Sequence, residues 1–187
     1  MTNAEHSVIP YELASRFGHR DFLRRLESRR ALIYVSPTAM NLRAEPATTR
    51  AEEPSAMPVL PPDRELAVVQ KTLTGALARP NKTGETSEYV VPGDAMLVVR
   101  FISGSVRRQA GPIVGGRFNV SLVVNSVVLD VGRFSMPQSE TYGNLPLTGI
   151  LVIAGPADRI AGCFTRSASS PLHSTSLVLG GKLWAAA

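Results

Sequence analysis

Residues 116–136 read GRFNVSLVVNSVVLDVGRFSM, and this stretch decides the fold. Phe118, Val120 and Leu122 alternate with polar residues in its first half. An alternation with period two is typical of a strand that turns one face to the core. The pair Asn125-Ser126 then separates this run from a second apolar run, and Asn and Ser are residues that turns favour. The stretch therefore predicts two successive strands with a turn between them.

The same signals recur on both sides of this stretch. Strand patterns separated by Gly, Pro, Asn or Ser cover residues 88–91, 96–103, 117–124, 127–135, 147–154, 160–166 and 175–184. Short strands at this spacing, without helical windows between them, predict a mainly β fold. We expect an antiparallel β-sandwich of about seven to eight strands over residues 85–187. The run 145–154 is apolar on both faces, which indicates a strand covered on both sides or a subunit contact, and we expect assembly.

The N-terminal part of the chain has a different pattern. Apolar residues recur near helical spacing from Tyr11 to Val35 without proline, so residues 1–40 are predicted to form a basic amphipathic helix arm. Its arginines are Arg16, Arg20, Arg24, Arg25, Arg29 and Arg30. The guanidinium fork pairs bidentately with phosphate, which favours RNA or an anionic membrane surface. The alternative is a solvated helix that packs its apolar stripe on the rest of the protein.

Two further segments complete the expected helical and proline-rich extension. Residues 41–62 hold five prolines among Ala, Thr, Glu and Arg, which predicts a linker. Residues 63–80 are predicted to form a short helix. Asp63 is placed to cap it, and Leu66, Val69, Leu73 and Leu77 would share one face.

Composition limits the possible functions. The net charge of +5 and the isoelectric point near 9.9 favour contact with a polyanion. Cys163 is the only cysteine and the three histidines are far apart in sequence, so we expect no disulfide and no cofactor or metal. The N-terminus has neither a basic start nor an apolar run, and no apolar stretch is long enough to span a bilayer. We therefore expect a protein that is not secreted.

The motifs of common catalytic sites are missing from the sequence. No Gly-Lys-Ser/Thr follows the glycines at 111–116, and no Gly-x-Ser-x-Gly occurs. We expect no enzyme activity and no small-molecule substrate, which leaves a binding or building function. Arg107 and Arg108, in an expected hairpin loop, and Arg117 would extend a basic face. Aromatic residues are few, so contact with single-stranded RNA would be to phosphate and insensitive to sequence.

A basic N-terminal arm, a proline-rich connector and a sandwich with strands apolar on both faces resemble the organisation of small coat proteins of positive-strand RNA viruses. The resemblance covers the whole chain. It implies a jelly-roll domain that self-assembles into a homo-oligomeric shell, and an arm that neutralises packaged RNA. It also implies a location in the virion or the host cytoplasm.

A second resemblance covers residues 95–155. The runs Gly116-Arg117-Phe118-Asn119, Gly132-Arg133-Phe134-Ser135 and Leu145-Pro146-Leu147 are similar to plant-virus cell-to-cell movement proteins. That family is also jelly-roll-like, and the resemblance implies binding of single-stranded nucleic acid without sequence preference. A third hypothesis is a cellular β-sandwich module that presents an edge strand or a loop to another protein.

Overall fold

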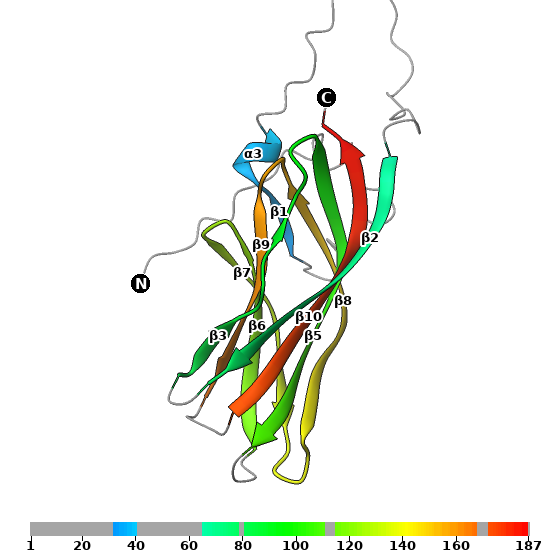
Figure 1. Ribbon diagram of the computed structural model, residues 1–187. Coiled ribbons are helices and arrows are strands. Elements are labelled where there is room, and N and C mark those ends of the chain that lie inside the picture. The colour runs from blue at the N-terminus through cyan, green and yellow to red at the C-terminus, as the bar shows by residue number, and fades with distance from the viewer. Residues whose placement is uncertain (1–31, 41–64, 79–80, 111–114, 168–171, 187) are drawn as a thin grey trace, which may run out of the picture.

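The computed structural model describes residues 32–40, 65–78, 81–110, 115–167 and 172–186. These residues form two facing five-stranded sheets with one short helix at one end of the sandwich (Figure 1). The elements are β1 (Ile33–Val35), α3 (Pro37–Met40), β2 (Glu65–Leu77), β3 (Thr83–Glu85), β4 (Tyr89–Val90), β5 (Ala95–Ala110), β6 (Gly116–Val124), β7 (Val127–Met136), β8 (Tyr142–Ala154), β9 (Arg159–Arg166) and β10 (Leu172–Ala185). The helix is too short to span a membrane, and no other helix lies in the described part of the chain.

The strand pairing defines a jelly roll. The first sheet has the order β1-β8-β5-β10-β2, and the second has the order β3-β9-β6-β7 with β4 also on β9. Four antiparallel pairings are nested along the chain: β6 with β7, β5 with β8, β3 and β4 with β9, and β2 with β10. A long hairpin that is rolled up also brings β10 beside β5 and β9 beside β6, as observed. The predicted antiparallel β-sandwich with jelly-roll topology is confirmed, and the described residues form ten strands where about seven to eight were expected.

The stretch that predicted the fold forms the hairpin at the centre of this arrangement. Phe118, Val120 and Leu122 are at most 1% exposed and point into the core between the sheets. Asn125 occupies the turn with a φ of 55°, a left-handed conformation that Asn tolerates better than most residues. Hydrogen bonds to the β8–β9 connection also hold the turn in place. The Asn125 side-chain NH₂ donates to the Asp158 carboxylate, and its Oδ1 accepts the Arg159 backbone N–H.

The prediction of a helix over residues 63–80 is wrong, because residues 65–77 form strand β2. Val69, Leu73 and Leu77 are four residues apart, and this even spacing also places them on one face of a strand, where they are buried. β2 is hydrogen-bonded along its length to β10, and this long-range pairing outweighs the weak local preference. The two sheets therefore include residues 33–35 and 65–77, which lie before the predicted start of the sandwich at residue 85.

The end of the predicted helical arm is also corrected. Residues 33–35, expected to be helical, form β1, which pairs in parallel with Leu151–Ile153 of β8. The chain then forms the single turn α3, whose first residue is Pro37 and whose Ala39 N–H donates to the Ser36 hydroxyl. The rest of the predicted arm, residues 1–31, and the linker at 41–62 lie outside the described residues.

Candidate nucleic-acid interface

The sandwich arginines of the predicted basic face lie at one end of the molecule. Arg107 and Arg108 are near the end of β5, and Arg117 is near the start of β6, and these two strand ends lie at the same end of the sandwich (Figure 1). The expectation that Arg107 and Arg108 occupy a loop is wrong, because β5 continues to Ala110 through pairing with both β8 and β10. The six arginines of the arm, Arg16, Arg20, Arg24, Arg25, Arg29 and Arg30, lie outside the described residues.

The three sandwich arginines are not equivalent. Arg107 and Arg117 are exposed, whereas Arg108 is half-buried. Arg108 Nη1 is buried without a hydrogen-bond partner among the described residues. Arg107 belongs to the first sheet and Arg117 to the second. The structure therefore brings these arginines to the same end of the sandwich, but on different sheets.

Arg117 lies in a shallow groove on the outer face of the second sheet. Two adjoining hollows, of about 480 and 320 Å³, share Arg117, Ser135 and Ser167. The first continues over Gly115, Gly116, Met136 and Pro137, and the second over Asn119, Arg133, Phe134, Thr165 and Arg166. Hydroxyl and amide side chains thus accompany the arginines, and these groups are the usual contacts to phosphate and sugar oxygens.

The groove adds Arg133, which was not among the predicted site residues. Arg117 pairs with Ser135 and Asn119 pairs with Arg133, so the two arginines are diagonal neighbours on one face, with Cα atoms about 7–8 Å apart. The sequence held a signal for this pair, since the tripeptide Gly-Arg-Phe occurs at 116–118 and again at 132–134. The hairpin pairs the last residues of the two copies, Phe118 and Phe134, so the two arginines come close to each other on the outer face.

The charges in the groove are open to a ligand. Arg133 is 4.0 Å from Asp130, and the two side chains are 76% and 62% exposed, so this ion pair is weak. Among the described residues no carboxylate forms an ion pair with Arg117. The Arg117 backbone is held in place instead, because its N–H donates to the Ser167 hydroxyl (3.4 Å) and its carbonyl accepts the Ser167 N–H (3.1 Å). Two exposed guanidinium groups on a fixed backbone suit an extended polyanion.

The lining of the groove offers little aromatic surface for stacking. Phe134 is the one aromatic residue in its lining, and its ring stacks on Phe118 with the centroids 5.3 Å apart and the planes at 16°. One face of Phe134 is therefore already covered, which limits stacking with a base.

Arg166 lies under the groove and has a structural role. It is 5% exposed, and its Nη2 donates to the carbonyls of Asn81 (2.7 Å) and Ala78 (3.3 Å), which ties the end of β2 to β9. Its Nη1 is 3.1 Å from Nδ1 of His173. A guanidinium only donates, so Nδ1 of the fully buried His173 ring is the acceptor of this hydrogen bond. The Phe118 ring meets this imidazole edge-on.

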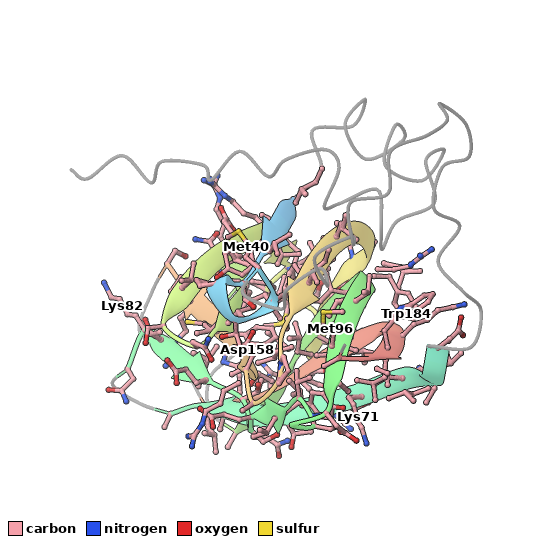
Figure 2. All side chains as sticks on the ribbon, turned by 90° about the horizontal axis from the view of Figure 1, so that it is seen from above. Met40, Lys71, Lys82, Met96, Asp158 and Trp184 are labelled. Atoms are coloured by element: carbon pink, nitrogen blue, oxygen red, sulfur yellow. The ribbon has the colours of Figure 1, made fainter. Side chains whose placement is uncertain are left out.

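A second buried polar cluster, at the opposite end of the sandwich, anchors the N-terminal segment. Asp158 is 2% exposed, and its carboxylate accepts hydrogen bonds from the Gly155 N–H (2.7 Å) and the Asn125 amide (3.0 Å). Burial by itself would raise the pKa of Asp158. Hydrogen bonds from Ser36, Asn125, Gly155 and Thr38 to the charged form have the larger combined effect, and the pKa is below its ordinary value. Figure 2 looks down on this end, with Asp158 near the middle of the view.

β1 leads toward the Asp158 cluster, in the direction away from the groove end of the sandwich. β8 begins at the groove end, and β1 runs parallel to it, so Leu32 is closer to the groove than Val35 is (Figure 1). The Ser36 hydroxyl then fixes the segment, since it accepts the N–H groups of Ala39 and Gly155, both at 3.1 Å. The described segment therefore runs along the last residues of β8 toward the Asp158 end of the sandwich.

Among the described residues no group of three His, Cys, Asp or Glu side chains is placed to hold a metal ion. No family model matches the sequence, and no curated protein matches it. Among solved structures the chain is similar to the CBM22-1 xylan-binding domain of Paenibacillus barcinonensis Xyn10C. The identity is 8% and the TM-score is 0.29, over 64% of this chain and 85% of that domain. The strand order and pairing of this chain, rather than this likeness, define it as a jelly-roll protein with a basic groove.

Proposed function

We propose that this chain is the coat protein of a small positive-strand RNA virus, in which jelly-roll sandwiches self-associate and contact RNA phosphates. The observation that carries the proposal is the exposed pair Arg117 and Arg133 in a polar groove at one end of a jelly roll. Viral capsid proteins are one of the protein classes built on this topology. Because a fold alone does not define a function, the groove and its charges are the part that experiment has to test.

In this mechanism RNA is bound through its backbone. The guanidinium groups of Arg117 and Arg133 pair with phosphate oxygens, and Asn119, Thr165 and Ser135 donate hydrogen bonds beside them. Arg107 adds charge at the same end of the sandwich, and the six arginines at 16–30 supply further phosphate contacts. Binding of this kind is insensitive to base sequence and weakens as salt rises.

The first experiment measures RNA affinity. Labelled single-stranded RNA of two unrelated sequences is titrated with the full chain and with the double variant Arg117→Gln/Arg133→Gln, by fluorescence anisotropy at several salt concentrations. The variant is expected to bind both RNAs more weakly, with the slope of log affinity against log salt reduced by about 0.7 for each arginine. Arg159→Gln is the matched control, because Arg159 is 66% exposed at the other end and pairs with Glu88 at 3.3 Å. If Arg159→Gln loses as much affinity for RNA as the double variant, the groove has no specific role in binding.

The second experiment measures assembly. Light scattering and electron microscopy of the chain with single-stranded RNA are expected to show closed particles of one narrow size. A chain that stays monomeric or dimeric with RNA at high concentration would count against a coat protein.

The open groove also fits a plant-virus movement protein, since such a groove can follow a single strand without enclosing it. Movement-type binding predicts cooperative coverage of RNA without closed particles. If the chain binds no RNA at any salt concentration, the cellular protein-interaction module is favoured instead.

A further inference from the structure

The edges of the two sheets differ in how they are protected from pairing with another chain. β3 is three residues long, and β7 carries Asp130 and Arg133. β8 is covered at Leu151–Ile153 by β1, and the rest of its edge contains Pro146. Short strands, charges and proline are the usual protective features of exposed edges. β2 is 13 residues long and contains no proline, and Lys71 is the only charged residue between its first residue, Glu65, and its end at Leu77.

The free part of the β2 edge has clear limits. Near Glu65 the register with β10 is irregular, since Leu183 pairs with Ala67 but Trp184 pairs with Glu65. At the other end Thr74 accepts the Ser87 N–H at 2.7 Å, and Gly75 forms a bridge with Thr86. Between these limits, residues 67–73 pair with β10 on one side, and no described strand pairs with the other. Unpaired N–H and C=O groups along such an edge can accept another strand.

The side chains of this segment are compatible with such pairing. Val68 is 76% exposed, and Leu66 next to the segment is 54% exposed. The one charged residue is Lys71, whose ammonium lies 5.7 Å from the centre of the Tyr89 ring. The free edge therefore has apolar side chains and little charge to repel a partner.

We propose that a second copy of this chain pairs its own β2 antiparallel with this edge, around a two-fold axis at Gln70. Gln70 is the midpoint of residues 67–73, so this register uses the whole free edge of both copies. It places Gln70 opposite Gln70, Val68 opposite Thr72 and Val69 opposite Lys71. No like charges face each other, whereas an axis at Lys71 would oppose two lysines.

A two-fold contact of this kind closes on itself, because the same edge is used by both copies. It buries the exposed β2 edge and joins two five-stranded sheets into one continuous sheet. The inference rests on the proposed function only in that a coat protein must contact copies of itself.

The test uses RNA-free full-length chain. Gln70→Cys in a Cys163→Ala background is expected to form a covalent dimer with a short bifunctional thiol reagent, since residues opposite each other in an antiparallel pair have Cβ atoms about 4.5–5.5 Å apart. Val128→Cys in the same background is the control, because Val128 is 62% exposed on β7 and belongs to a different edge. Equal cross-linking of both variants, or none at Gln70, would overturn the proposal.

Sedimentation velocity tests the same contact without a cross-link. The unmodified chain is expected to sediment as a dimer, and Gln70→Lys is expected to weaken the dimer about fivefold by placing two ammonium groups across the axis. Thr74→Lys adds the same charge outside the free edge and is expected to leave the dimer intact. A dimer that forms no particles with RNA would contradict the coat protein but leave this contact standing. Particles built from a chain that is monomeric without RNA would contradict this contact alone.

Discussion

Asp158→Asn tests the cluster that joins the N-terminal segment to the sandwich. An asparagine keeps the size of the side chain, but its NH₂ group replaces one acceptor and faces a donor, either the Gly155 N–H or the Asn125 amide. One charge-assisted hydrogen bond is lost and the others are weakened. Each such bond contributes about 1.5–3 kcal/mol, so the free energy of unfolding should fall by about 3 kcal/mol. For a chain of this size that lowers the melting temperature by roughly 6–12 °C.

The pH dependence gives the same experiment a second readout. The pKa of Asp158 is lowered in the folded state, so the unfolded state binds more protons in the acid range and stability rises with pH there. The advantage of the unmodified chain over Asp158→Asn is therefore fully present above the ordinary Asp value of about 3.9. It should be lost as the pH falls through the lower folded-state value.

The assay is thermal unfolding followed by circular dichroism between pH 7 and pH 2.5, with Asp130→Asn as control. Asp130 is 62% exposed and weakly paired, so its substitution should change the free energy of unfolding by no more than about 0.5 kcal/mol. The reasoning is refuted if Asp158→Asn and the unmodified chain have the same melting temperature at pH 7. It is equally refuted if the difference between them stays constant down to pH 2.5.

Other substitutions and reagents probe the packing between and beneath the strands. Gly180→Ala should destabilise the fold by about 2 kcal/mol or more in denaturant titrations, because a Cβ there would overlap the Phe101 ring; an unchanged midpoint would contradict this. Arg166→Gln removes the hydrogen bond to the Asn81 carbonyl, so it should lower the melting temperature and speed proteolysis between β2 and β3. If the variant and the unmodified chain are cleaved at equal rates, this hydrogen bond does not protect the connection. The pKa of the Cys163 thiol is raised, mainly by burial and to a smaller extent by the nearby charge of Glu85. Cys163 should therefore react with a thiol reagent far more slowly in the native chain than in the unfolded chain. If the native and the unfolded chain react at comparable rates at pH 7.5, Cys163 is not buried in this way.

The sequence predicted several features of the fold and groove correctly because the signals are local. The alternation of Phe118, Val120 and Leu122 specifies which face of a strand is buried whatever the partner strand is. Asn125 marks the turn through its own backbone preference. Arg117 directly precedes Phe118 in this alternation, which puts it on the opposite face, and it is exposed.

Other features depend on which strands become neighbours, and a linear pattern does not contain that information. Val69, Leu73 and Leu77 fit one face of a helix and one face of a strand equally well, and pairing with β10 decides between them. Arg133 joins Arg117 only because the β6–β7 register pairs Phe118 with Phe134.

The Asp158 cluster is the clearest case of a feature that tertiary structure alone decides. Its members Ser36, Asn125 and Asp158 are separated by tens of residues, and none belongs to a recognisable motif. They meet because β1 lies on β8 and because the β6–β7 turn folds onto the β8–β9 connection. By itself the sequence determined that the chain forms strands with one buried face and that Arg117 lies on the exposed face of its strand. The rolling of those strands into two sheets decided which polar groups are buried together, since only strand pairing brings distant segments within hydrogen-bonding distance.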